Sequence, residues 1–372
     1  MSFDPYRVVS DPTARLAVAV IRETLGVAAE GELGHALPRD AHAWADAMAR
    51  LPRAGVTPAL HTTLAARELQ AQVPLQVLER LRRMAIAAAA AEAVRLSALG
   101  GVLETLEPAG FEVFAIKGAA LSVLMPAYAQ LRPAADVDVW VPGRAANDAN
   151  RLLQERGYKL RDAESAEDAR KCHCPPLVSP GDGTVIEVHR RPWLSPHQAD
   201  APPCAHTRVH HEQLNRPARV PATEQLIVIQ AAHAAVGDTA PGNLRTIWDV
   251  AALARLGRTD WALVAELAAR IGSLRGVKAV LSRVALLGLA EVPAQVRISP
   301  RAEARVRLTW ADNSRPRSTI SRIWRRCAAL DGPTDWLRTG LLALPLAGRR
   351  SPAPARRRTA SSQPAHTPGK GE

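Results

Sequence analysis

Two aspartates separated by one residue stand in a short apolar segment, DVDVWV, at positions 136–141. Alternate side chains of a strand share a face, so Asp136 and Asp138 are expected to project together while the neighbouring valines face a core. Two carboxylates on one face can hold a hard divalent cation such as Mg²⁺ or Mn²⁺. A solvated pair of aspartates at a sheet edge is the alternative, and the commoner outcome for an isolated pair.

A third carboxylate follows in the segment TVIEVH, at positions 184–189. The same alternation puts Glu187 and His189 on one face. Carboxylates holding two divalent ions about 4 Å apart suit an in-line displacement at phosphorus, so phosphoryl or nucleotidyl transfer is the chemistry indicated. A glutamate on an exposed edge strand is the alternative for Glu187. His189 could orient a ligand or contact a phosphate, or it could simply be a hydrogen-bonded strand end.

A candidate phosphate site lies in the segment FAIKGAAL, at positions 114–121. Gly118 would let the backbone pass close to a ligand, and the helix predicted after it would aim free N–H groups at an anion. Lys117 would add a positive charge. This pattern is weaker than a Walker A loop, and a strand-to-helix turn with a solvated lysine fits it equally well.

The string KCHCPP, at positions 171–176, contains soft metal ligands at an unfavourable spacing. Structural zinc sites favour C-x₂₋₄-C, and adjacent residues of an extended segment point to opposite faces. Cys204 and His206 would have to be recruited from a distant loop. We therefore expect no zinc site here.

These candidate residues require strands in the middle of the chain and helices on either side of it. Strands are predicted over 111–117, 136–141 and 184–189, because apolar and β-branched residues alternate there between turn-forming residues. A helical period predicts helices over 13–25, 41–51, 57–69, 74–99, 119–128, 143–157, 223–235, 244–256, 261–271 and 274–289. Gly100 and Gly101 are expected to interrupt or bend the fourth of these helices, and Thr223 and Asp260 are plausible N-caps.

The predicted fold class is α+β, with a small mixed sheet between helical regions. We expect an N-terminal helical region over 1–107, an α/β core over 108–220 and a C-terminal helical region over 221–340. Residues 341–372 are rich in Pro, Ser and Arg and are expected to be a disordered basic tail.

The net charge of +12 is concentrated near the C-terminus. Residues 301–348 hold nine Arg against four acids, and residues 349–372 hold five Arg and one Lys against one acid, so only +2 remains for the first 300 residues. A basic substrate channel in the core is therefore not indicated, and nucleic-acid binding stays open for the tail.

The cellular compartment is inferred from cysteine usage and from apolar runs. Four cysteines in a chain of 372 residues are too few and too unevenly spaced for a disulfide scaffold. The N-terminus lacks a signal-peptide pattern, and the apolar run over 84–91 is too short to span a bilayer, so no transmembrane segment is expected. These features predict a cytoplasmic protein.

The run KGAALSVLMPAYAQLRPAADVDVWV, at positions 117–141, resembles the bacterial uncharacterised nucleotidyltransferase family, a branch of the DNA polymerase beta-like superfamily. In that family a Lys-Gly pair opens a helix, an arginine precedes the acidic strand, and a D-h-D-h strand carries metal ligands. Arg132 matches the arginine, and EVHRRPW, at positions 187–193, is similar to the later acidic strand. The resemblance extends weakly over residues 75–295. The chain departs from the superfamily at Ala119, where a serine usually follows the glycine.

The resemblance implies a sheet of nucleotidyltransferase type and an enzyme that uses Mg²⁺ (or Mn²⁺) to transfer NMP from an NTP to an acceptor. Asp136, Asp138 and Glu187 would be the metal ligands, and Lys117, Gly118 and Arg132 would bind the nucleotide. His233, Arg245 and Asp249 are further candidates for the nucleotide cleft, although Arg245 and Asp249 could instead pair with each other, four residues apart on one helix. The acceptor could be a small molecule, peptide, protein or RNA. The alternative is a non-catalytic accessory protein of the same fold that binds partners through its helical regions and basic tail.

Overall fold

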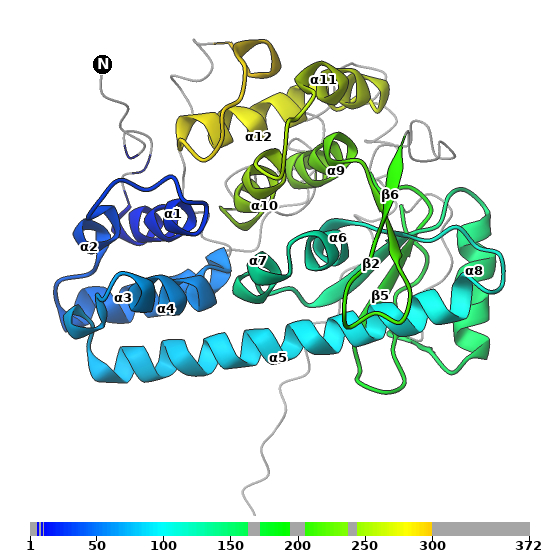
Figure 1. Ribbon diagram of the computed structural model, residues 1–372, viewed down its shortest axis with the longest axis horizontal. Coiled ribbons are helices and arrows are strands. Elements are labelled where there is room, and N and C mark those ends of the chain that lie inside the picture. Colours follow the sequence, from blue (N-terminus) through cyan, green and yellow to red (C-terminus); the bar gives the residue numbers. More distant parts are fainter. Residues whose placement is uncertain are drawn as a thin grey trace, which may run out of the picture.

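The structure is a computed structural model that describes residues 6, 9, 11–162, 172–193, 205–236 and 244–299. The predictions for Cys204, for residues 300–340 and for the basic tail fall outside these residues. A group of N-terminal helices lies at one end of the molecule and a sheet at the other, and one long helix, α5 (Leu75–Leu106), runs beneath both (Figure 1). The short helices beside the sheet lie between α5 on one side and the C-terminal helices on the other.

The N-terminal helices begin and end at residues that satisfy their free backbone groups. Asp11 and Asp40 accept hydrogen bonds from the first turns of α1 and α3, and Gly55 ends α3 in a left-handed conformation that glycine adopts without strain. The elements of this region are α1 (Pro12–Thr24), α2 (Glu32–Ala36), α3 (Ala41–Ala54), α4 (Thr57–Ala66), the short 3₁₀ helix η1 (Gln70–Gln72) and α5 (Leu75–Leu106).

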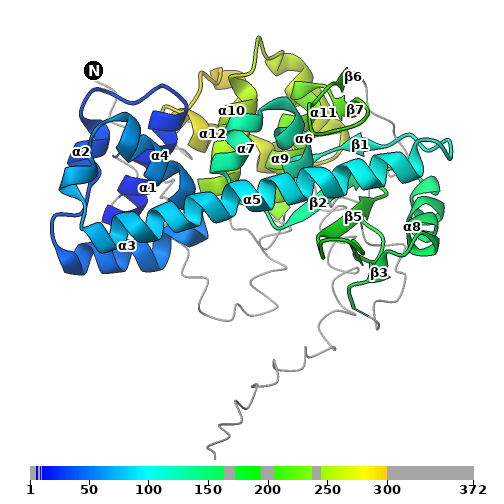
Figure 2. The ribbon, with the colours of Figure 1, turned by 60° about the horizontal axis from the view of Figure 1, so that its bottom comes forward.

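Helix α5 is continuous through Gly100 and Gly101, so of the predicted interruption or bend the interruption does not occur. Both glycines lie where a neighbour comes close: a Cβ at Gly100 would stand 3.5 Å from Leu214, and one at Gly101 would stand 3.1 Å from the Tyr158 hydroxyl. Burial of this end of α5 therefore outweighs the weak helix propensity of glycine. Figure 2 shows the helix crossing the whole width of the molecule.

The middle of α5 is Ala-rich and largely exposed. Alanine is the best helix former, so this stretch stays helical with little packing against it. Within the described residues, α5 is the one helix long and apolar enough to cross a membrane by length and composition, and 39% of its apolar window is buried inside the structure. That finding does not show a membrane span.

The sheet has seven strands in the order β3-β4-β5-β2-β1-β7-β6. At its centre β2 runs parallel to β5 and antiparallel to β1, and β1 runs parallel to β7, so the sheet is mixed, as predicted for the α+β class. The strands are β1 (Phe114–Ala115), β2 (Asp136–Trp140), β3 (Lys159–Leu160), β4 (Leu177–Val178), β5 (Val185–His189), β6 (His206–Val209) and β7 (Ala218–Pro221).

Three helices connect or cover the strands: α6 (Lys117–Leu124), α7 (Pro126–Leu131) and α8 (Ala145–Glu155). The single helix predicted over 119–128 is in fact two, because Pro126 cannot continue the first helix and instead begins the second. The C-terminal helices are α9 (Thr223–Val236), α10 (Leu244–Ala254), α11 (Trp261–Arg270) and α12 (Leu274–Leu286), followed by the 3₁₀ helix η2 (Ala294–Val296). The Asp260 side chain caps α11, as predicted.

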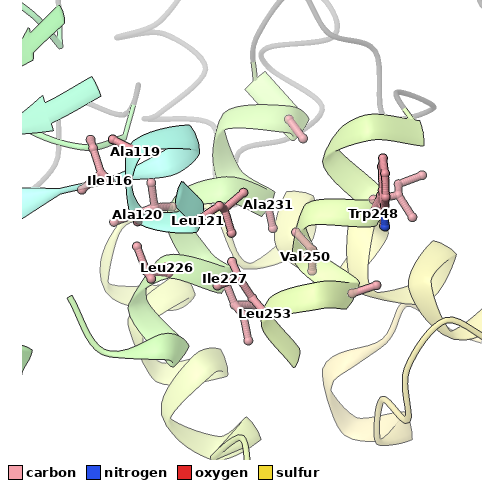
Figure 3. Close-up of a cluster of buried hydrophobic side chains, with 14 of the residues drawn as sticks. Ile116, Ala119, Ala120, Leu121, Leu226, Ile227, Ala231, Trp248, Val250 and Leu253 are labelled. Atoms are coloured by element: carbon pink, nitrogen blue, oxygen red, sulfur yellow. The ribbon is translucent and has the colours of Figure 1, made fainter. Parts of the chain in front are cut away.

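A cluster of buried side chains joins α6 to the C-terminal helices (Figure 3). Ile116 and Leu121 pack in this cluster with Leu226 and Ile227 of α9 and with Trp248 of α10, and all are 2% exposed or less. Burying a large apolar side chain contributes about 1.5–3 kcal/mol, so the contact holds α6 firmly. The helix that begins at Lys117 is therefore fixed both to the sheet and to α9 and α10.

Candidate metal and nucleotide site

The two acidic strands lie side by side in the sheet. Strands β2 and β5 pair in parallel with Asp138 opposite Glu187 and Trp140 opposite His189. Partners on neighbouring strands share a face, so the Asp138 and Glu187 side chains project together, and Asp136 lies two residues away on that same face. The structure thus places Glu187, about 50 residues further along the chain, on the same face as the two aspartates.

Asp138 is the centre of a buried hydrogen-bond network. Its Oδ1 accepts from Lys117 Nζ at 2.9 Å and lies 2.7 Å from His189 Nε2. The same imidazole nitrogen is 3.5 Å from Glu187 Oε2, and it is 3.4 Å from Lys117 Nζ. Lys117 is therefore not a solvated lysine. It is a cation held against the acidic strand, 10% exposed.

The contacts within this network stabilise the charged forms of Asp138, His189 and Lys117. Burial would raise the pKa of Asp138, but Lys117 and His189 hold it well below its usual range. Burial and the nearby Lys117 would lower the pKa of His189, yet its contacts with Asp138, Cys172 and Glu187 raise it to about 10. Burial likewise opposes the charge on Lys117, and Asp138 more than offsets that effect and raises the lysine pKa. In the absence of a bound cation the network therefore holds protonated His189 and Lys117 against ionised Asp138.

Asp136 differs from its neighbour. It stands half-buried at the start of β2, and burial together with the charges of Asp138 and Glu187 raises its pKa. Glu187 shows the opposite shift: burial would raise its pKa, but its contact with His189 lowers it. Of the three carboxylates, Asp136 is thus the one whose pKa is raised rather than lowered.

A set of ligands for a cation exists among the described residues. One atom each from Asp138, Glu187 and His189 can be chosen so that all lie within 4.8 Å of one another. Two of the three predicted metal carboxylates belong to this set, and His189 joins them. The two carboxylates of this set are ligands that suit Mg²⁺ or Mn²⁺.

The turn at Lys117 and Gly118 leads from the first strand into α6, and two arginines lie beside it. Lys117 begins α6 with a left-handed φ of 49°, a conformation that is strained for a residue with a side chain. A Cβ at Gly118 would stand 3.1 Å from Nη1 of Arg132 and 3.5 Å from Nη1 of Arg95. The space that glycine leaves is therefore occupied by two guanidinium groups.

Arg132 is buried and makes a two-pronged ion pair with Asp249 of α10. Its Nε and Nη2 donate to the two carboxylate oxygens at 2.7 and 2.6 Å. Tyr128 and Gln230 donate to the same carboxylate. The ion pair of Asp249 is therefore with Arg132, from another segment of the chain, rather than with Arg245 on its own helix. Arg245 instead reaches the Pro133 carbonyl at 3.5 Å.

Several site residues were not predicted from the sequence. Arg95 and Glu92 of α5 are both buried and form an ion pair beside Gly118. Their spacing of three residues on an otherwise apolar helix face was an available signal, but nothing linked it to the acidic strands. Cys172 also lies at the site: burial would raise the pKa of its thiol, and its hydrogen bond with His189 lowers it. His233 of α9, by contrast, was a candidate from the family resemblance, and burial together with the charge of Lys117 lowers its pKa to about 3.

Comparison with known families agrees with this geometry. The sequence profile of a family described as "Uncharacterised nucleotidyltransferase" matches residues 40–288, which is well over half of the chain. The match begins just before α3 and ends just after α12, so it covers the acidic strands and both groups of helices that contact them. Among proteins with curated descriptions, none matches the chain. On the strength of the profile match, the chain belongs to the uncharacterised nucleotidyltransferase family.

Proposed function

We propose that this protein transfers a nucleoside monophosphate from an NTP to an acceptor and that it uses Mg²⁺ or Mn²⁺ to do so. The observation that carries the proposal is the register of β2 and β5, which sets Asp138 beside Glu187 with Asp136 on the same face. Membership of the family supports a nucleotidyltransferase-type function. The acceptor, whether small molecule, peptide, protein or RNA, is open.

The residues present fit a divalent ion. Asp138 and Glu187 supply oxygen ligands, Asp136 extends the same face, and His189 adds a nitrogen within the same small volume. A bound Mg²⁺ or Mn²⁺ would stabilise negative charge on the phosphate oxygens during the displacement. For a metal ion to bind, Asp138 must give up its contacts with the positively charged Lys117 and His189. Lys117 would then move from the carboxylate towards phosphate when the ion and nucleotide bind.

The transfer requires an acceptor atom to lose a proton as it attacks the α-phosphorus. The bond to the α-phosphorus forms, the bond to the bridging oxygen of pyrophosphate breaks, and pyrophosphate leaves with the electron pair. We assign the proton to Asp136, because its pKa is raised whereas those of Asp138 and Glu187 are lowered.

The test is calorimetric binding of ATP, GTP, CTP and UTP in the presence of Mg²⁺. We expect one or more NTPs to bind to the wild type, and the double variant Asp136→Asn, Glu187→Gln to bind at least tenfold more weakly. Neither residue anchors Lys117, so the variant should remain folded. Asp148→Asn is the matched control, because Asp148 is exposed on α8 and pairs only with Arg151 among its described ion pairs.

The metal dependence is tested by repeating the titration in EDTA, where we expect NTP affinity to fall. The proposal fails if no NTP binds to the wild type with Mg²⁺, or if the double variant binds as well as Asp148→Asn. In the first case the non-catalytic accessory role becomes the better account of the fold.

A further inference from the structure

The ammonium group of Lys117 lies against the residues that would bind a metal ion. Its Nζ donates a hydrogen bond to Asp138 Oδ1 at 2.9 Å and lies 3.4 Å from His189 Nε2. Asp138 and His189, together with Glu187, are the residues whose ligand atoms lie within 4.8 Å of one another. The chain therefore already supplies a cation of its own to the candidate metal site.

This cation shares an enclosed volume with the carboxylate that it neutralises. The exposed fraction of the side chain is 10% for Lys117, 5% for Asp138 and 1% for His189. Two like charges repel much more strongly in such a volume than in water, because little solvent screens them. A divalent ion on Asp138 would share that carboxylate with the ammonium group, so the ion and Lys117 would oppose each other's binding.

Main-chain pairing fixes the position of Lys117 beside Asp138 independently of the lysine side chain. The N–H of Ile116, the residue before Lys117, donates to the main-chain carbonyl of Asp138 at 3.2 Å, next to the pairing of β1 with β2. Ile116 is fully buried, and most residues of α6 are buried as well. The backbone at Lys117 is therefore held beside Asp138 whether or not Nζ contacts the carboxylate.

The backbone conformation of Lys117 is itself unusual. Its φ is 49°, and Glu68 is the only other non-glycine residue in the described part of the chain with a positive φ. Such strain persists where the surrounding structure imposes it, and it is concentrated at functional sites. Because the backbone is fixed, the flexible four-carbon stem is the part of Lys117 that can move. Nζ can thus leave Asp138 while the strand and the helix stay in place.

That movement needs a new partner for the ammonium group. A lysine that left its carboxylate within a closed site would be an unpaired buried charge, which is costly. Phosphate oxygens meet the need, because an ammonium group has three donors and binds phosphate as a point charge. A divalent ion that binds together with a polyphosphate therefore replaces Lys117 on Asp138 and brings the lysine a new counter-charge in the same event.

We propose that Lys117 competes with the metal ion for Asp138, so that the site binds a divalent ion weakly when alone and strongly together with a polyphosphate. Only the choice of a nucleotide as that polyphosphate rests on the proposed function. Linkage makes the effect reciprocal: the polyphosphate strengthens metal binding by the same factor by which the metal strengthens polyphosphate binding. Lys117 thus selects the complex of metal and nucleotide over either component.

The probe is Mn²⁺ alone, and the free ion is measured by its EPR signal in protein solutions without nucleotide. We expect Lys117→Met, which removes the charge and keeps a long side chain, to bind Mn²⁺ about tenfold or more tightly than the wild type. Lys117→Arg keeps the charge and should bind Mn²⁺ as weakly as the wild type. Lys159→Met is the matched control, because it removes the same charge from the exposed strand β3. Its Mn²⁺ affinity should equal that of the wild type.

A lysine with a purely structural role gives the opposite result, since its loss would leave Mn²⁺ affinity unchanged or lower it. The proposal is overturned if Lys117→Met binds Mn²⁺ no more tightly than Lys159→Met, or if neither variant binds it. Asp138 keeps its contact with His189 in Lys117→Met, which favours a folded variant.

A measurement on the wild type decides the question if Lys117→Met does not fold. Mn²⁺ should raise the rate at which acetic anhydride acetylates Lys117, measured by mass spectrometry of the peptides, because the ion takes the carboxylate from Nζ. Lys159 is the internal reference, and its rate should not change. The proposal fails if Mn²⁺, at any concentration that the protein tolerates, leaves the rate at Lys117 unchanged relative to Lys159.

The link to the nucleotide has its own readout. In calorimetric titrations, Mn²⁺ should raise the NTP affinity of the wild type by a larger factor than that of Lys117→Met, because only the wild type must free Asp138 from the lysine. Equal factors in the two proteins would overturn the link.

The two proposals can fail separately. If Lys117→Met gains Mn²⁺ affinity but the wild type binds no NTP, the competition stands and the transferase proposal fails. If NTP binding depends on Asp136 and Glu187 while Lys117→Met binds Mn²⁺ like Lys159→Met, the transferase proposal stands and this one fails.

Discussion

A single oxygen, Oδ1 of Asp138, holds both Lys117 and His189 in a site that is almost closed to water. Replacing Asp138 with Asn would leave two buried cations without their counter-charge, which typically costs about 3–5 kcal/mol. We therefore expect Asp138→Asn to lower the free energy of unfolding, measured in urea and EDTA, by about that amount. Asp148→Asn should change it by less than about 0.5 kcal/mol. Equal stabilities of the two variants would show that Asp138 is not the anchor of this network.

The same network predicts a pH dependence of stability. The pKa of His189 is raised from 6.5 to about 10 on folding, so its contribution is fully present below pH 6.5 and is lost as the pH rises to about 10. In EDTA, the free energy of unfolding should therefore fall across this range, and His189→Gln should flatten the curve. Both proteins should carry Cys172→Ser, because the pKa of that thiol is lowered and it would titrate in the opposite sense. A decline of equal slope in the two proteins contradicts the assignment.

At the scale of elements, two buried glycines in helices predict opposite responses to a methyl group. Gly100 in α5 would place a Cβ at an ordinary 3.5 Å from Leu214, so Gly100→Ala should stabilise the protein by about 0.5–1 kcal/mol through helix propensity. Gly118 in α6 would place its Cβ 3.1 Å from Arg132, which cannot yield because Asp249 holds it on two sides. Gly118→Ala should therefore not be stabilised in this way. Unfolding temperatures of the two variants test this contrast.

The elements that carry the acidic residues were predictable because their sequences repeat with the period of a strand. Strands β2 and β5 agree with the segments predicted over 136–141 and 184–189 to within a residue. The strand predicted over 111–117 is shorter in the structure, Phe114–Ala115, because α6 begins at Lys117. Strands β3, β4, β6 and β7 were missed because each has only two to four residues, too few for an alternating pattern to show.

The partners of the site residues were harder to predict than the elements. Glu187 lies opposite Asp138 because β2 and β5 pair in parallel. No pattern within either segment predicts that pairing. The end of α5 and strand β1 lie between Arg95 and the Lys117–Gly118 turn in the sequence. Arg95 comes close to Gly118 only because α5 packs against this turn. The predicted boundaries at 107/108 and 220/221 stay predictions, and the contacts of Arg95 cross the first of them.

At the scale of the whole molecule, the site is assembled from every described region. The sheet supplies the carboxylates, α5 supplies Arg95, and α10 supplies Arg245 and Asp249. A charge count over 300 residues averages these contributions to nearly zero, which is why it gave no sign that Arg95, Arg132 and Arg245 lie within electrostatic reach of Asp136. Composition therefore indicates the net charge of a whole region but not the local charge at a site.

The Arg132–Asp249 pair is the connection through which the C-terminal helices hold the segment before β2. The side chain of Asp249 is fully buried and that of Arg132 is 7% exposed. Arg132→Met would leave the Asp249 carboxylate buried without its cation and should cost about 3–5 kcal/mol in urea unfolding. Adding Asp249→Asn removes that charge while keeping an acceptor for Tyr128 and Gln230. The double variant should then be more stable than Arg132→Met alone.

A double-mutant cycle measures this coupling, because the two side chains contact each other directly. We expect an interaction energy of about 1–3 kcal/mol between positions 132 and 249, and none between Arg132→Met and the distant control Asp148→Asn. Additive effects at 132 and 249 would mean that the pair does not connect the two regions. If the coupling is present, NTP binding should fall in Arg132→Met and recover in part in the double variant, since the segment that positions Asp136 regains its contact with α10.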